Sequence, residues 1–186
     1  MLIMRSLRKA MIQIPITNEM KQIAERGEKM ILKSFKGNHN YTGLSADRRF
    51  YFGILGELAT VELLRIKGVR VKYTPKWNGK ADSGDLIVYA DGYPIKVDVK
   101  TASKDFHENL WMPAKQYDRY TYDGYIGVRI CGDVAEIHGY CAKKDFTKSM
   151  HPRAKVPTYG VALCDLRQMD KLYPKLDAGD TLIKIS

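Results

Sequence analysis

The sequence predicts an α/β (α+β) fold in which a central mixed sheet is flanked by helices, within one domain of 186 residues. Three observations lead to this prediction. Two long stretches in the first third of the chain carry apolar residues at helical spacing. Short runs rich in Val, Ile and Tyr follow, separated by turn-forming residues. One of these turns, Asp91-Gly92, joins two apolar runs and is a strong hairpin signal.

The two helices are expected at residues 17–35 and 46–66. In the second, Ser45 is the expected N-cap and Gly68 the residue that closes the C-terminal end. Two glycines of this helix, Gly53 and Gly56, are expected to let it approach a sheet closely.

Three β-type runs, at residues 69–73, 85–89 and 95–101, predict an antiparallel meander after the helices. Pro113 then suits the first turn of a third helix, at residues 114–122. The expected order continues with strands at 125–130 and 134–140, a basic loop at 143–158, a strand at 159–163 and a short helix at 165–172.

The charge balance favours a polyanionic partner. Thirty-one Lys and Arg against twenty-one Asp and Glu give a net charge of +10, which suits phosphate contacts on nucleic acid. A basic surface that only maintains solubility explains the charge equally well.

The cysteines and the N-terminal stretch bear on the compartment. Cys131, Cys141 and Cys164 are odd in number and have no paired short spacing, so neither a disulfide framework nor a thiolate zinc site is expected. Basic residues interrupt the first sixteen positions, so no signal peptide or membrane span is expected there. These features favour a cytoplasmic, intracellular protein, in a host cell if the chain is viral.

The Asp91-Gly92 turn fixes a register with chemical consequences. With these two residues at the centre of the turn, Asp85 lies directly opposite Asp98, with the Cβ atoms about 5 Å apart. Lys100 shares their face. The other face is apolar throughout, with Leu86, Val88, Ile95, Val97 and Val99. A three-residue loop would separate the carboxylates and break this apolar layer.

Two opposed carboxylates repel each other unless a cation lies between them. Carboxylate oxygens suit Mg²⁺, with Mn²⁺ as a substitute. A salt-bridged solvent face that includes Lys96 is the alternative explanation. About two acid-x-Lys matches are expected by chance in this composition, and two occur, but only Asp98-Val99-Lys100 has a facing acid.

Glu57 lies within the core-facing stripe of the second predicted helix. An ionised glutamate is costly to bury, so this side chain is expected to be neutral, paired with a basic group, or directed at a metal.

One order of elements, over residues 46–130, is a helix with Glu57, then a meander with Gly84-Asp85 and Asp98-Val99-Lys100 on adjacent strands, then a helix and further strands. This order resembles the PD-(D/E)xK nuclease superfamily. Gly84 stands where the family name has proline. The resemblance implies a restriction-endonuclease-like αβββαβ core. It also implies that Asp85 and Asp98 bind the metal, that Lys100 assists the attacking water, and that Glu57 completes the acidic site.

Gln116 and Tyr120, in the next predicted helix, are similar to the Gln-x-x-x-Tyr signature of RecB-like and phage exonucleases. A packing role explains these two residues as well, and a Holliday-junction-resolvase-like member is a further reading. The resemblance divides the chain into an N-terminal helical extension (1–45), a catalytic core (46–140), and a basic loop with a C-terminal strand and helix (141–186).

Candidate nucleic-acid contacts surround this core. Residues 72–80 interleave basic and aromatic side chains, and Trp77 either stacks on a base or packs within its loop. The candidates are Arg48, Arg49, Lys72, Lys76, Trp77, Lys80 and Tyr120. The sequence therefore predicts a Mg²⁺-dependent hydrolase of DNA duplexes, junctions or ends, in recombination, repair or phage and mobile-element processing, with a homo-oligomer possible by analogy. The alternative is a non-catalytic nucleic-acid-binding protein on a similar fold.

Overall fold

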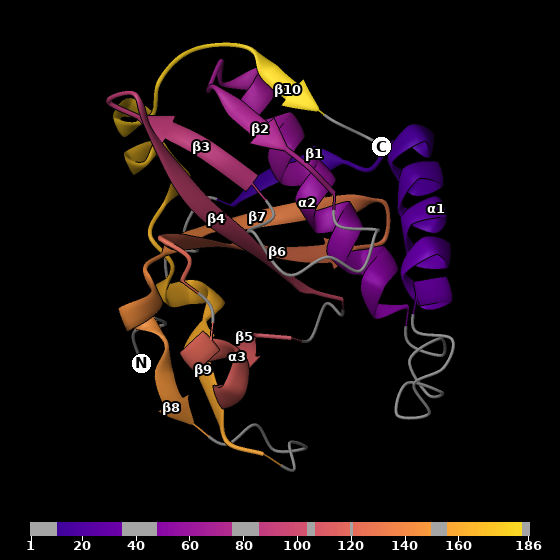
Figure 1. Cartoon of the computed structure of the whole chain (residues 1–186), viewed down its shortest axis with the longest axis vertical. Helices are drawn as coiled ribbons and strands as arrows, with labels where there is room; N and C mark the ends of the chain where they lie inside the picture. The colour runs from indigo at the N-terminus through magenta and orange to yellow at the C-terminus, as the bar shows by residue number, and fades with distance from the viewer. Residues whose placement is uncertain are drawn as a thin grey trace, which may run out of the picture.

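The structure is a computed structural model, and it describes residues 11–34, 48–75, 86–103, 107–119, 121–149 and 156–183. It contains a large mixed sheet, a small antiparallel sheet and two long helices (Figure 1). The predicted mixed α/β class is therefore confirmed. None of the helices in these ranges is long and apolar enough to cross a membrane.

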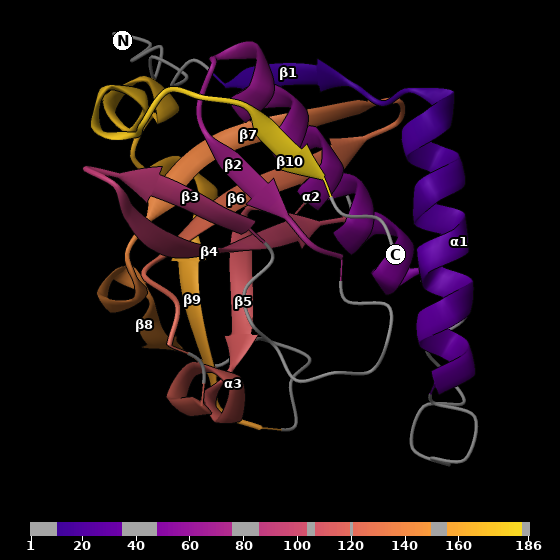
Figure 2. The ribbon, with the colours of Figure 1, turned by 45° about the horizontal axis from the view of Figure 1, so that its top comes forward.

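The large sheet has seven strands in the order β1-β7-β6-β4-β3-β2-β10, and it curls as Figure 2 shows. The pairs β4–β6 and β2–β10 are parallel, and the other neighbours are antiparallel. The strands are β1 (Ile12–Pro15), β2 (Val71–Tyr73), β3 (Leu86–Ala90), β4 (Tyr93–Ala102), β6 (Gly124–Cys131), β7 (Val134–Cys141) and β10 (Thr181–Ile183). The predicted meander corresponds to β2, β3 and β4.

The predicted hairpin register is also confirmed. Asp91 and Gly92 have φ angles of 52° and 80°, so both central residues of the turn are in the left-handed region that a tight two-residue hairpin requires. Leu86 pairs with Val97, and Val88 pairs with Ile95. The apolar layer predicted on one face of the hairpin is therefore continuous.

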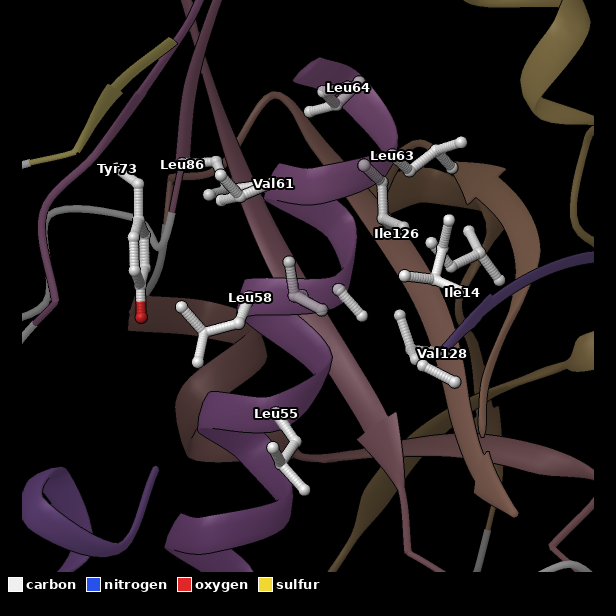
Figure 3. Close-up of a cluster of buried hydrophobic side chains, with 14 of the residues drawn as sticks. Ile14, Leu55, Leu58, Val61, Leu63, Leu64, Tyr73, Leu86, Ile126 and Val128 are labelled. Atoms are coloured by element: carbon white, nitrogen blue, oxygen red, sulfur yellow. The ribbon is translucent and has the colours of Figure 1, made fainter. Parts of the chain in front are cut away.

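Two helices stack on one face of this sheet. The first, α1 (Asn18–Ser34), packs on the second, α2 (Arg49–Ile66), and α2 packs against the sheet. The main core fills the space between α2 and the strands. Figure 3 shows Leu55, Leu58, Val61 and Leu63 of α2 in this core together with Leu86 of β3 and Ile126 of β6. The expected amphipathic character of α1 is explained by this packing, whereas α2 is buried on most of its sides because it lies between α1 and the sheet.

The start of α2 differs from the prediction. Its N-cap is Arg48, with φ of 49°, whereas Ser45 lies outside the described residues. A carboxylate of the neighbouring helix binds the first turn of α2, because Tyr51 N–H donates to Glu28 Oε1 at 3.4 Å. The C-terminal end is as predicted, with Gly68 in the left-handed region at φ 66°.

A second, smaller sheet consists of β5 (Asn109–Pro113), β9 (Thr158–Ala162) and β8 (Thr147–Ser149), in that order. It lies beside β4 in both views (Figures 1 and 2). A second core joins it to β6 and β7, and this core includes Leu110, Met112, Tyr125, Cys141 and Leu166.

Several expected boundaries were wrong. The helix predicted at 114–122 is α3 (Ala114–Arg119), and Tyr122 instead enters the second core edge-on against Tyr125. The predicted basic loop contains a 3₁₀ turn, η3 (Lys143–Asp145), and strand β8. The Ala142 N–H donates to Asp145 Oδ2 at 2.7 Å, and this bond closes the turn.

The helix predicted at 165–172 is replaced by 3₁₀ turns, η4 (Leu163–Asp165) and η5 (Met169–Lys171), with η6 (Tyr173–Lys175) beyond. Arg167 exchanges both backbone hydrogen bonds with Tyr140 of β7, each 2.8 Å long. Because these bonds use the N–H and C=O groups that a helix would need, an α-helix cannot run through Arg167.

Candidate functional site

Asp98 and Lys100 lie on β4, the strand between β3 and β6. Val97 and Val99 belong to the core beneath α2, so alternation along the strand turns Asp98 and Lys100 to the opposite face. Lys100 Nζ lies 2.7 Å from Asp98 Oδ2. The predicted common face is confirmed for Asp98 and Lys100. Asp98 is only 4% exposed, so this ion pair is not part of a solvated face.

The surroundings of Asp98 are poorly solvated. Its register partner in β6 is Tyr125, and burial together with the negative charge of Asp98 raises the pKa of Tyr125 above its usual value of 10.0. Beside Lys100 lies Gly127, where an added Cβ would come within 2.9 Å of Leu110 Cδ1. Because charges interact strongly in such a setting, the attraction between Lys100 and Asp98 is stronger here than it would be at the surface.

Glu57 is half-buried on α2 and accepts a hydrogen bond from Tyr73 Oη at 2.8 Å. Tyr73 is fully buried in the core beneath α2, and its register partner Leu86 faces the same core. The expectation for Glu57 was a neutral state, a basic partner or a metal. The structure adds a hydroxyl donor, which the sequence pattern did not suggest.

Gly56 explains why α2 lies so close to β4. An added Cβ at this position would overlap the hydroxyl of Thr101, whereas Gly53 has nothing within 4 Å of such a Cβ. The expected close approach is therefore confirmed for Gly56 and wrong for Gly53. The contact holds Glu57, the next residue of the helix, beside the C-terminal half of β4.

The described part of the predicted acidic site is distributed over two faces of the large sheet. Glu57 and Tyr73 lie on the α2 face, and Asp98 and Lys100 point to the other. Asp85, the third predicted acid, lies outside the described residues. Within the ranges that the structure describes, no three His, Cys, Asp or Glu side chains are arranged to hold a metal ion.

Gln116 is exposed on α3, which packs on β5 and β9 of the small sheet. The helix ends at Arg119, and Tyr120 is outside the described residues, so the predicted pairing of Gln116 with Tyr120 has no structural description. The neighbouring Tyr117 stacks on Tyr159, with 3.8 Å between ring centroids.

Three of the predicted nucleic-acid contacts can be located. Arg48 lies against acids of α1, with Nη2 3.8 Å from Glu25 and Nε 3.4 Å from Glu28, and its guanidinium covers the Tyr51 ring. Arg49 is exposed at the first turn of α2, and Lys72 is half-buried on β2. Lys76, Trp77 and Lys80 lie outside the described residues.

A cleft of about 550 Å³ on the small sheet was not foreseen from the sequence. Trp111 and Gly160 lie in it on adjacent strands. No sequence signal could have joined them, because nearly fifty positions separate them along the chain.

No family model and no curated protein matches this chain. Among solved structures, it is similar to a bacterial homing endonuclease, I-Ssp6803I, with a TM-score of 0.33 and 17% sequence identity, over 59% of this chain and 81% of that chain. A likeness of this size does not assign the chain to a family.

Proposed function

We propose that this chain is a magnesium-dependent nuclease that hydrolyses DNA phosphodiester bonds. The observation that supports this most is the buried carboxylate of Asp98, which lies 2.7 Å from the Lys100 ammonium on one face of a hairpin with the predicted register. A buried acid beside a lysine, in a chain with a net charge of +10, suits chemistry on a phosphate group.

The metal ligands in this proposal are Asp85 and Asp98. Continued by one pair beyond Leu86 and Val97, the β3–β4 register would set Asp85 opposite Asp98. Their carboxylate oxygens are the hard donors that Mg²⁺ prefers, and Mn²⁺ is a suitable substitute. When bound, the metal would supply an activated water and stabilise charge on the phosphate. Glu57, which the resemblance implies as a third acid, lies on the opposite face of the sheet from Asp98, so its part in the site is tested separately with Glu57→Gln.

Lys100 has the role of a mobile cation at this site. Its ammonium neutralises Asp98 in the free protein, and it would turn toward the attacked phosphate or the attacking water when substrate enters. Gln116 is proposed as a further catalytic residue. The residues proposed to contact DNA are Arg48, Arg49, Lys72, Lys76, Trp77, Lys80 and Tyr120. Duplexes, junctions and ends are all compatible substrates, and recombination, repair and mobile-element processing are the settings proposed.

The second candidate is a non-catalytic nucleic-acid-binding protein. The same short contact favours it, because Lys100 already compensates the charge of Asp98 without any metal. Glu57, with its Tyr73 partner on the other face, is compatible with either candidate.

Cleavage of labelled single- and double-stranded oligonucleotides, with Mg²⁺ and with EDTA, tests the proposal. We expect activity that requires Mg²⁺ and is lost in Asp98→Asn, Asp85→Asn and Lys100→Ala. Lys96→Ala is the matched control, because Lys96 is an exposed lysine on the same strand, and it should retain activity. Cleavage that persists in Asp98→Asn would refute the site, and DNA binding without hydrolysis would favour the second candidate.

A further inference from the structure

The cleft on the small sheet lies on the face that points away from the second core. Leu110 and Met112 of β5 are buried in that core, so the alternating residues Asn109 and Trp111 point outward. The polar and aromatic residues that line the cleft include Asn109, Trp111, Lys144, Thr147, Asp165 and Arg167. Its volume of about 550 Å³ is in the range of small-ligand sites.

Trp111 forms a rigid, flat floor in this cleft. Its register partner in β9 is Gly160, and a Cβ at Gly160 would come within 2.8 Å of the indole ring. The ring therefore lies directly on the backbone of β9, in space that a larger residue would fill. Thr147 of β8 pairs with Gly160 on the far side, so the floor extends across all three strands.

The charges around this floor nearly cancel. Arg167 Nη2 lies 2.6 Å from Asp145 Oδ2, so these two charges neutralise each other. Lys144 and Asp165, both exposed, add one charge of each sign to the lining. A cleft with no net charge does not suit a phosphate group. An aromatic floor with amide, hydroxyl and carboxylate groups at its edge instead suits a flat, uncharged ring that carries hydrogen-bonding groups.

We propose that this cleft binds a nucleobase of single-stranded DNA, which stacks on Trp111. The inference rests on the proposed function only in that DNA is taken as the substrate. The site is distinct from the proposed hydrolytic site, because Asp98 and Lys100 belong to the large sheet and Trp111 faces away from the core between the two sheets.

The edge groups supply the selectivity. The Asn109 amide can donate and accept at a base edge, and the Asp165 carboxylate accepts from an exocyclic amine. Duplex DNA cannot use this cleft, because its bases are stacked on each other and paired. Binding here therefore requires an unpaired or splayed strand, and the proposed nuclease would prefer substrates that contain one.

Tryptophan fluorescence tests the proposal, since the chain has only two tryptophans. In a Trp77→Phe parent, Trp111 is the sole reporter, and EDTA prevents cleavage during titration. We expect saturating quenching by oligo-dT and, at lower concentrations, by oligo-dC, because cytosine has the exocyclic amine that thymine lacks. Blunt duplex should give no quenching. Mononucleotides serve as the probe for a free-nucleotide site: quenching by dTMP at the same concentrations as by oligo-dT would overturn the assignment to a strand.

Two variants measure the contribution of the floor. Trp111→Leu should weaken oligo-dT binding about tenfold, whereas Trp111→Phe should retain most of the affinity. Because stacking involves no phosphate, the slope of log affinity against log salt should be the same in the parent and in Trp111→Leu. An unchanged affinity in Trp111→Leu, or a smaller salt slope, would overturn the proposal.

Gly160→Ala guards against a folding artefact in Trp111→Leu. This variant keeps the tryptophan at position 111, but the added methyl pushes its indole ring away from β9. The emission of Trp111 should therefore shift, and its quenching by oligo-dT should weaken. The binding assay also separates the two proposals. Quenching with no hydrolysis under any condition would refute the proposed nuclease activity and support the base-binding cleft. Hydrolysis without quenching would support the nuclease activity and refute the base-binding cleft.

Discussion

The ammonium of Lys100 lies 2.7 Å from the carboxylate of Asp98, with both side chains on the same face of β4 and largely withdrawn from solvent. Their side chains are 21% and 6% exposed, respectively. Two charges in such a setting depend on each other, because removal of one leaves the other poorly solvated and uncompensated. The pair is thus a structural element as well as the centre of the proposed active site, and the two roles must be separated by experiment.

Asp98→Ala should lower the free energy of unfolding by about 3 kcal/mol, because it strands the Lys100 ammonium. Urea denaturation measures this, and Lys96→Ala should change stability by less than about 0.5 kcal/mol. The double variant Asp98→Ala with Lys100→Met should recover part of the loss, since no uncompensated charge remains. Strictly additive effects of the single variants Asp98→Ala and Lys100→Met would show that the charges do not interact.

Gly56→Ala should destabilise the protein by about 2 kcal/mol, because its methyl group would overlap the Thr101 hydroxyl and push α2 from β4. Gly53→Ala is the matched control in the same helix. Nothing lies within 4 Å of its added Cβ, so helix propensity alone should stabilise the protein by roughly 0.5 to 1 kcal/mol. Equal effects of the two substitutions in urea denaturation would contradict the close approach at Gly56.

The hairpin and the faces of β4 could be predicted because their causes are local. A two-residue Asp-Gly turn fixes the register, and alternation then places Asp98 and Lys100 together. The sequence could not indicate on which face of the sheet Glu57 would lie. Helical periodicity identifies a buried stripe but not the sheet face that it covers, and the Tyr73 hydroxyl that meets Glu57 belongs to another element.

The missed elements have tertiary causes. β10 is three residues long and forms only because Thr181 reaches Val71, far away in the sequence. The start of α2 depends on Glu28 of α1, so the local capping signal at Ser45 was misleading. The predicted helix through Arg167 was prevented by backbone bonds to Tyr140. In each case a contact between distant segments outweighed local propensity.

Tyr73→Phe and Glu57→Gln separate the structural role of Glu57 from metal binding. Tyr73→Phe should cost about 1 kcal/mol of stability through loss of the 2.8 Å hydrogen bond, without a change in the Mg²⁺ concentration needed for cleavage. Glu57→Gln keeps an acceptor for Tyr73, so stability should change little. If Glu57 is a third ligand, however, half-maximal cleavage should require more Mg²⁺. An unaltered Mg²⁺ requirement in Glu57→Gln would remove Glu57 from the proposed acidic set.

His138 on β7 gives the stability of the protein a pH dependence. Burial and the nearby Arg129 cation hold the pKa of His138 below its usual value of 6.5, although Glu136, 3.6 Å away, acts in the opposite direction. Above 6.5 the histidine is neutral in both the folded and unfolded states, so it makes no difference to stability there. As the pH falls below 6.5, the unfolded chain takes up a proton that the folded protein resists, and stability decreases until the lower folded-state pKa is passed.

His138→Gln should remove this decrease. Urea denaturation between about pH 8 and pH 5 measures it, a range in which unperturbed carboxylates stay ionised. Glu136 has a lowered pKa because of its bond to Arg129, so its own loss of stability begins only below its usual value of 4.5 and lies outside this range. If the variant and the wild type lose stability in parallel as the pH falls from 6.5 to 5, another group carries the dependence and the assignment to His138 is wrong.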